Sequence, residues 1–140
     1  MTNVRLGSSY IERARGRLQF LRQMQQAGLH ADVVRESQEI VELALKGLLR
    51  VMGLDPPKEH DVSKFMAKER RHLPKVVVDH LSEIRRMSKR LRRERELAFH
   101  GDTDFIPSYE YDVEDSNEAI QFAEAIVDWV ERGLQELKPQ

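Results

Sequence analysis

The sequence contains no cysteine, which excludes disulfide bonds, thiolate metal sites and a cysteine nucleophile. Its seven glycines are scattered and form neither a P-loop nor a GxGxxG motif, so the two common phosphate-binding loops are absent. No apolar run approaches the roughly 20 residues that a membrane-spanning helix needs. The first residues, MTNVRLGSSY, lack the apolar centre of a signal peptide. We therefore expect a cytoplasmic protein with no membrane partner.

The balance of charge limits the partners that the whole molecule attracts. The chain has 23 lysines and arginines against 24 aspartates and glutamates, a formal net charge of −1. A nearly neutral molecule has no overall attraction for a polyanion, so a nucleic-acid site would have to be a local patch. The 140 residues, 40% of them hydrophobic, suffice for one compact core. We expect a single domain over residues 1–140.

The spacing of the apolar residues indicates helices throughout. They recur at intervals of three and four residues rather than two, as on a helix with one buried face. Capping residues, prolines and glycines divide the chain into five helical segments. The expected segments run from Ser8 or Ser9 to Gly28, from Asp32 to Gly53, from Asp61 to Arg71, from Pro74 to about residue 100, and onward from Asp112. Four long amphipathic helices predict an all-α fold, an up-and-down four-helix bundle with one extra short helix.

The stretch RLRRERELAFHGD, residues 90–102, combines a dense run of charge with a histidine. The apolar residues of this helix share one face, which should meet the core: Val77, Leu81, Ile84, Leu91 and Ala98. Arg95 follows Val77 by about five helical turns, which places it on that apolar face. Because an unpaired buried charge is costly, we expect the Arg95 guanidinium to be largely buried and paired with a carboxylate, with Glu42 a candidate.

One interpretation of this charged stretch is structural. Arginines and glutamates at a helix end commonly form a solvated face, and His100 followed by Gly101 suits a helix C-terminus. Arg95 does not fit this interpretation, because a guanidinium on the core face needs a carboxylate or phosphate partner. Arg93 precedes His100 by seven residues and lies only about 20° from it around a helix, whereas Arg95 lies about 140° away.

Three sequence elements resemble the HEPN domain family, named for higher eukaryotes and prokaryotes nucleotide-binding. In ESQEIVELALKGLL, Glu42 and Lys46 have the family's Glu-x-x-x-Lys spacing, which is also a favourable pair on a helix. In EHDVSKF, His60 and Asp61 match the His-Asp before the family's short helix. Structure alone also accounts for both, since Asp61 suits a helix cap and His60 a loop anchor. An arginine followed after four to six residues by His100 completes the resemblance, which covers nearly the whole chain.

The resemblance implies a site for RNA or a nucleotide near the end of a late helix. In active members, two subunits pair through these helices and cut RNA in the shared cleft without a metal or other cofactor. Arg95 with His100 leaves four intervening residues and Arg93 with His100 leaves six, so both registers fit. A histidine can take the ribose 2′-hydroxyl proton, and an arginine can hold the phosphate. The candidate catalytic residues are therefore His100, Arg95 and Arg93, with Arg90 and Arg92 as candidate contacts to the RNA backbone.

Two functions remain open under this resemblance. The first is a metal-independent endoribonuclease, the toxin of a toxin–antitoxin pair whose antitoxin is a nucleotidyltransferase. The second is a non-catalytic HEPN module that binds a nucleotide or a protein partner. The chain departs from the toxin-type pattern at Asp102, where such members usually carry a tyrosine that the antitoxin can modify. A homodimer is expected, with RNA or a nucleotide as the ligand and no DNA.

Overall fold

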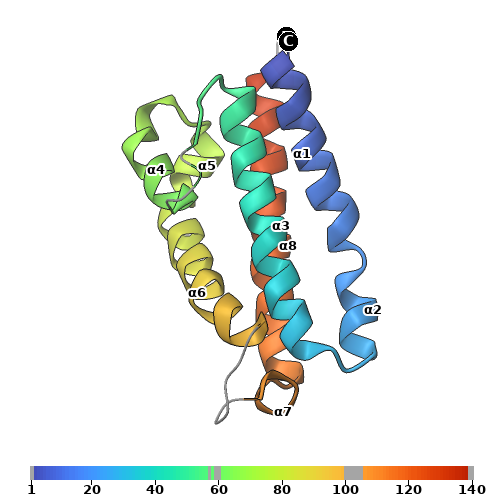
Figure 1. The fold of residues 1–140 in the computed structure, drawn as a ribbon. Helices are drawn as coiled ribbons and strands as arrows, with labels where there is room; N and C mark the ends of the chain where they lie inside the picture. Colours follow the sequence, from blue (N-terminus) through green and yellow to red (C-terminus); the bar gives the residue numbers. More distant parts are fainter. Residues whose placement is uncertain (1, 57, 59–60, 100–105, 139–140) are drawn as a thin grey trace.

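The computed structural model describes residues 2–56, 58, 61–99 and 106–138 of the chain. Within these ranges the secondary structure is helical without any strand, which confirms the expected all-α fold. The long helices are α1 (Thr2–Leu18), α3 (His30–Val51), α6 (Leu81–Phe99) and α8 (Val113–Leu137). The short ones are α2 (Leu21–Gln26), α4 (Val62–Lys68), the 3-10 helix η1 (Arg70–His72), α5 (Lys75–Asp79) and α7 (Pro107–Glu110). The long helices alternate in direction, so α1 begins at the end of the bundle where α8 finishes (Figure 1).

Helix α3 is the central element and packs against α1, α6 and α8. Apolar residues such as Leu45, Leu48 and Leu49 are fully buried, and Asp32 is its one exposed residue. This enclosure leaves a single half-buried polar stripe along the helix. The stripe consists of Arg35, Glu39, Glu42, Lys46 and Arg50. Because these residues follow one another at three or four positions, they lie above one another on one face of α3.

Helices α1 and α3 approach closely where each carries a glycine. A Cβ atom added to Gly47 would lie 2.8 Å from the carbonyl oxygen of Gly7 and 2.8 Å from Cγ1 of Ile11. A Cβ atom on Gly7 would lie 2.5 Å from the carbonyl oxygen of Gly47. Some of these neighbours are backbone atoms, which cannot turn aside as a flexible side chain can. The two helices can therefore lie this close because both residues are glycine.

Several expected helix boundaries agree with the structure, and others differ. Gly28 and Gly53 have positive φ angles of 79° and 80° and follow the ends of α2 and α3, as expected for helix-ending glycines. The first helix, however, begins at Thr2 rather than at Ser8 or Ser9, and it ends at Leu18, so that the separate helix α2 forms the rest of the segment expected to run to Gly28. Asp32 does not cap α3, since it lies inside a helix that begins at His30.

The long helix expected from Pro74 is interrupted at His80. The His80 ring has its Nδ1 atom 2.8 Å from the carbonyl oxygen of Val76 and stacks on the Trp129 ring at a centroid distance of 4.3 Å. This side-chain contact to the backbone competes with regular helical hydrogen bonding and is fixed by a residue of α8. The result is a short α5 followed by α6.

Asp61 caps α4, as the sequence predicts. Its carboxylate accepts hydrogen bonds from the Ser63 amide at 3.0 Å and the Ser63 hydroxyl at 2.7 Å, and it lies 3.4 Å from Arg92 Nη1. Burial raises the pKa of Asp61, but the hydrogen bonds from Ser63 and the charge of Arg92 outweigh it and lower the pKa below its ordinary value of 3.8. The cap thus joins α4 to α6.

Replacing Asp61 with alanine should lower the free energy of unfolding by about 1 to 2 kcal/mol, because the cap of α4 is lost. Asp61→Asn is the control, since asparagine also caps but carries no charge for Arg92. A carboxyl with a lowered folded-state pKa stabilises above its unfolded pKa, here near 3.8, and loses this contribution as pH falls through the folded value. Urea unfolding should therefore show the advantage of aspartate over asparagine at neutral pH, and this advantage should shrink as the pH falls below about 3.8. An alanine variant as stable as the wild type would contradict the cap.

Candidate functional site

The charged run at the end of α6 separates into arginines with different neighbours. Arg90 Nε lies 2.6 Å from a Glu118 oxygen on α8, and Arg92 pairs with Asp61 before α4. Arg95 Nη2 lies 3.6 Å from Glu39 Oε1 on α3. Arg93, by contrast, has a side chain that is 74% exposed, and among the described residues its one carboxylate within ion-pair distance is that of its neighbour Glu94, at 3.7 Å. The run therefore both ties α6 to three other elements and presents Arg93 to solvent.

The expectation that Arg95 is largely buried is wrong in extent, and its carboxylate partner differs from the candidate named. The Arg95 side chain is 39% exposed and pairs with Glu39, whereas Glu42 pairs with Lys46 at 3.2 Å. The Cα position does fall on the apolar side of α6, between the buried residues Leu91 and Ala98. The long side chain extends from there to the polar edge, where its charge remains hydrated. Because the pair is only half-buried, its loss should cost about 1 kcal/mol or less rather than the several expected of a buried pair.

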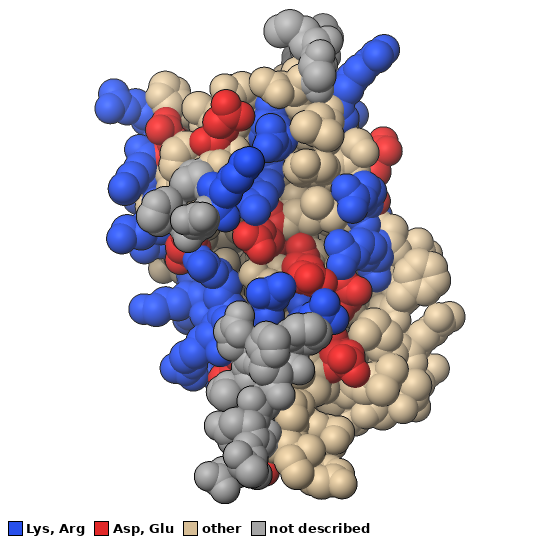
Figure 2. Space-filling model, in the orientation of Figure 1, with Lys and Arg blue, Asp and Glu red and all other residues tan. Residues whose placement is uncertain are grey.

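Glu39 is the centre of an arginine cluster that joins three helices. Its carboxylate lies within 4 Å of Arg17 from α1, Arg35 from α3 and Arg95 from α6. Arg17 also pairs with Glu36. Among the described residues, three guanidiniums and two carboxylates thus meet here. Figure 2 shows basic and acidic side chains interleaved along the middle of this face.

The second family element continues the same polar stripe. Lys46 pairs with Glu42 at 3.2 Å, which confirms the expected pair on the helix, and the amide of Gln38 donates to Glu42 at 3.3 Å. Arg92 and Asp61 lie on the α4 side of α6. The Glu-x-x-x-Lys element of α3, the aspartate before α4 and Arg95 thus belong to three elements that pack on one another.

Tyr111 anchors the segment after α7 to the end of α6. Its hydroxyl donates to Glu94 Oε2 at 2.7 Å and lies 3.3 Å from the Glu94 carbonyl oxygen. Burial raises the pKa of Tyr111, as do the hydrogen bond to Glu94 and the charges of Glu94 and Asp115. The phenol therefore stays protonated and donates. Together with Arg90 and Glu118, these residues line a partly open pocket of about 70 Å³.

Sequence reasoning missed Glu39 and Tyr111. A signal for Glu39 was available, because Arg35, Glu39, Glu42 and Lys46 follow the helical period as an unbroken charged stripe. Tyr111 has no comparable signal, since its partner Glu94 is 17 residues away across a loop. His100 and His60 lie outside the described residues.

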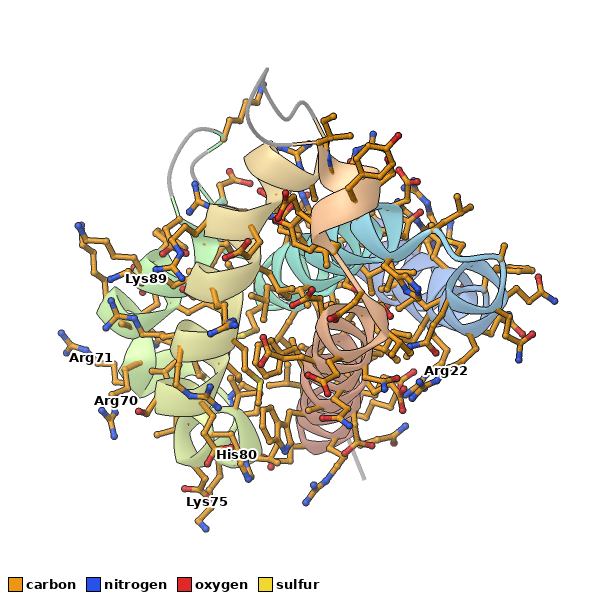
Figure 3. The ribbon with its side chains drawn as sticks, turned by 90° about the horizontal axis from the view of Figure 1, so that it is seen from below. Arg22, Arg70, Arg71, Lys75, His80 and Lys89 are labelled. Carbon is orange, nitrogen blue, oxygen red and sulfur yellow. The ribbon has the colours of Figure 1, made fainter. Side chains whose placement is uncertain are left out.

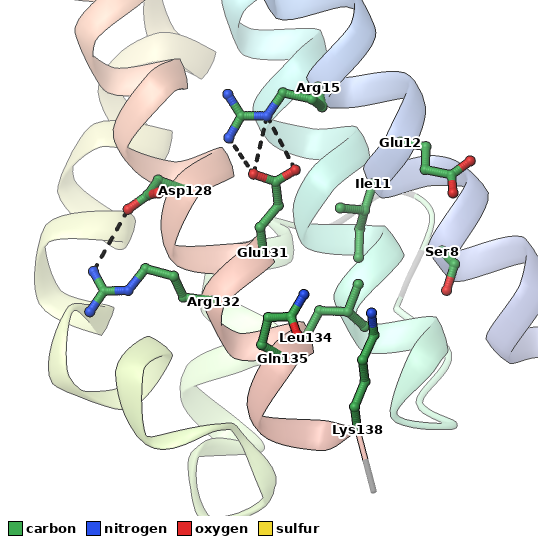
Figure 4. Close-up of a pocket in the computed structure, with 10 residues that line it drawn as sticks. All are labelled: Ser8, Ile11, Glu12, Arg15, Asp128, Glu131, Arg132, Leu134, Gln135 and Lys138. Atoms are coloured by element: carbon green, nitrogen blue, oxygen red, sulfur yellow. Dashed lines mark hydrogen bonds and ion pairs between the residues drawn. The ribbon is translucent and has the colours of Figure 1, made fainter. Parts of the chain in front are cut away.

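A larger hollow of about 600 Å³ lies between α1 and α8 (Figure 4). Four of its charged side chains form two pairs: Arg15 donates two hydrogen bonds through Nε to Glu131, at 3.1 and 3.2 Å, and Arg132 lies 3.7 Å from Asp128. Glu12 and Lys138 also line the hollow, which contains no residue of α6. The hollow is therefore separate from the Arg95 cluster.

Two further features are absent from the part of the chain that the structure describes, a metal-binding cluster and a membrane-spanning helix. No group of three or more histidine, cysteine, aspartate or glutamate side chains there could hold a metal ion. No helix of the described ranges is both long and apolar enough to cross a membrane.

Comparison with known protein families supports the family that the three sequence elements resemble, and a helical bundle fits that family. The HEPN domain family matches residues 8–133 of the 140-residue chain, and the chain therefore belongs to the HEPN domain family. No curated protein and no solved structure matches the chain.

Proposed function

We propose that this HEPN domain is a metal-independent endoribonuclease whose site lies at the C-terminal end of α6. The observation that carries the proposal is the position of Arg95. Its side chain, on α6, is 39% exposed and pairs with Glu39, and α6 packs against α3 and α4, the helices of the family's other two elements. An arginine that is held in place but still accessible is suited to bind a phosphate.

His100 is the proposed general base in this site. Its imidazole takes the proton of a ribose 2′-hydroxyl, and the 2′-oxygen forms a bond to the adjacent phosphorus. The bond from phosphorus to the 5′-oxygen breaks, and the departing oxygen takes up a proton from water. Arg95 stabilises the negative charge on the non-bridging oxygens during this step. The products are a 2′,3′-cyclic phosphate and a 5′-hydroxyl, and no metal or other cofactor takes part.

The site is proposed to form between two copies of the chain. Exposed apolar side chains support this arrangement, because Leu29, Ile106 and Tyr109 are 46%, 45% and 81% exposed. They lie before α3 and in or beside α7, and α7 packs on both α3 and α6. An apolar surface adjoining the end of α6 suits a homodimer in which the Arg–His elements meet. A nucleotidyltransferase antitoxin remains the proposed partner on family grounds, although Asp102 removes the usual tyrosine acceptor.

A non-catalytic module is the second candidate, and one observation favours it. Arg90, Arg92 and Arg95 each pair with a carboxylate from another element, as arginines that only hold helices together would. In that case the charged face would bind a nucleotide or a protein partner without cleaving RNA.

Arg95→Ala and Arg93→Ala distinguish the two registers and test the proposed function. Loss of Arg95 should slow RNA cleavage by roughly 10²–10³-fold, the usual effect of removing one donor to a developing charge. Arg93→Ala should change the cleavage rate by less than about threefold, because Arg93 would then attract the RNA through its charge without stabilising the transition state. Thermal melting of both variants would separate a chemical loss from unfolding. Cleavage that is lost in Arg93→Ala and kept in Arg95→Ala would assign the site to the longer register instead.

A further inference from the structure

Positive charge is concentrated in one part of this nearly neutral chain. Residues 62–95 contain 12 lysines and arginines and four acidic residues, Glu69, Asp79, Glu83 and Glu94. Helix α8 (Val113–Leu137) has the opposite character, with seven acidic residues and one arginine. The molecule therefore has a basic side, formed by α4, η1, α5 and α6, and an acidic helix, although its net charge is only −1.

Many cations of this basic side are uncompensated. Seven of them are exposed and have no carboxylate within ion-pair distance in the described ranges. They are Lys64, Lys68, Arg70, Arg71, Arg85, Arg86 and Lys89, of which Arg86 lies over the Phe122 ring. Figure 3 shows Arg70, Arg71, Lys75 and Lys89 directed outward on one side of the bundle, with Arg22 on the opposite side. The basic side chains also line the α4 and α6 edge of the face in Figure 2.

Some of these cations line two surface hollows, and others form a row along α6 that leads to the proposed site. An open hollow of about 490 Å³ lies between Arg70 and Arg85, and a second of about 530 Å³ is lined by Lys68, Arg71 and other residues of η1 and α5. Along the exposed face of α6, cations recur at residues 85, 86, 89, 92 and 93. At 1.5 Å per residue this row is about 12 Å long, and it ends beside Arg95.

We propose that this basic side is a docking surface for the phosphodiester backbone of RNA, continuous with the cleavage site. The inference rests on the proposed function, which identifies the ligand as RNA. An RNA strand whose scissile phosphate lies at Arg95 must continue over a neighbouring surface. The row of cations along α6 can neutralise phosphates of that strand. Exposed lysine and arginine side chains without carboxylate partners lose no existing ion pair when they do so.

The composition of the surface favours a nucleic-acid backbone over a protein partner. All the large apolar side chains that are exposed in the described ranges lie outside residues 62–95. A protein interface ordinarily has an apolar centre with aromatic residues, and a base-reading surface has aromatic platforms. Cations without either suit contacts to phosphates, so binding should be independent of sequence and strongly dependent on salt.

The test is RNA binding by a variant with four neutralised cations, in the His100→Ala background so that no probe is cut. The variant carries Arg70→Gln, Arg71→Gln, Arg85→Gln and Lys89→Gln. A control variant with the same change in net charge carries Arg5→Gln, Arg13→Gln, Arg22→Gln and Arg132→Gln on other helices. Fluorescence anisotropy would follow binding to a labelled oligouridine of about 20 nucleotides between about 50 and 200 mM salt.

The surface variant should bind about 100-fold more weakly at the lowest salt, and its plot of log affinity against log salt should be less steep by roughly 3, or about 0.7 for each lost contact. The control should change affinity by less than about threefold. Equal losses in both variants, or none in either, would overturn the inference. So would unchanged RNA affinity combined with dissociation of a dimer in sedimentation, which would assign the surface to contact with the acidic helix of a second copy. If the unmodified chain cuts no RNA but the surface variant loses binding, the proposed cleavage fails and the docking surface stands.

Discussion

Replacing His100 with alanine should slow RNA cleavage by roughly 10²–10⁴-fold, the usual contribution of a general base. The residue is proposed to remove the ribose proton, and water is a poor substitute for an imidazole at neutral pH. Cleavage of an end-labelled structured RNA in single-turnover assays would measure the change. His72→Ala is the comparison variant: its side chain is 60% exposed in η1, on the proposed docking surface but not in the cleavage site, so the single-turnover rate at saturating protein should be unaltered.

The same variant must keep its fold for that result to concern chemistry. Circular dichroism, thermal melting and sedimentation of His100→Ala should match those of the wild-type chain. Equal loss of activity in the His72 control, or full activity in His100→Ala, would remove His100 from the mechanism.

Replacing Gly47 with alanine should lower the free energy of unfolding by about 1 to 3 kcal/mol, the usual cost of overpacking. The new methyl group would lie 2.8 Å from both the Gly7 carbonyl oxygen and a side-chain atom of Ile11, so α1 would have to move away from α3. Valine at this position should cost more, because it adds further atoms to the same contact. Urea unfolding would measure both changes.

Gly16→Ala in α1 is the matched control, and its expected effect has the opposite sign. A Cβ atom there would meet no heavy atom within 4 Å. Alanine favours a helix interior over glycine by about 1 kcal/mol, so this variant should be more stable than the wild type by up to that amount. A stabilised Gly47→Ala variant would show that the two helices are not in tight contact at that glycine.

The sequence predicts the bundle because its signals are local. Apolar residues at helical spacing identify the long helices, and Asp61 and Asp112 can each cap the helix that follows without reference to the rest of the chain. In the structure, Asp61 accepts hydrogen bonds from Ser63, and Asp112 forms a capping box with Asp115. The Glu42–Lys46 pair is equally local.

The structure differs from the sequence-based predictions where the contacting side chains are far apart in the sequence. The break at His80 depends on stacking against Trp129 of α8, which no pattern around His80 indicates. The periodicity of α6 places the Cα atom of Arg95 correctly but not the end of its long side chain, which reaches Glu39. A helical wheel gives the direction of Cβ atoms only, so the partner of a long cation remains open until the neighbouring helix is placed.

The partial exposure of Arg95 allows it a binding role as well as a structural one. A buried arginine would be a structural residue, whereas one that is 39% exposed and oriented by a carboxylate can also bind a ligand. The remaining arginines have different surroundings, since Arg90 and Arg92 join helices and Arg93 faces solvent. Dense charge beside a histidine thus serves both the attachment of α6 to its neighbours and the proposed contact with RNA.

Analysis of RNA products in the presence of EDTA tests the central claim most directly. Purified wild-type chain and His100→Ala would be incubated with the same structured RNA, and the ends of the fragments identified by mass spectrometry. The wild type should produce 2′,3′-cyclic phosphate and 5′-hydroxyl ends without added metal, and His100→Ala should produce almost none. A wild-type chain that binds the RNA but leaves it intact, or cuts it only when a divalent metal is supplied, would contradict the account.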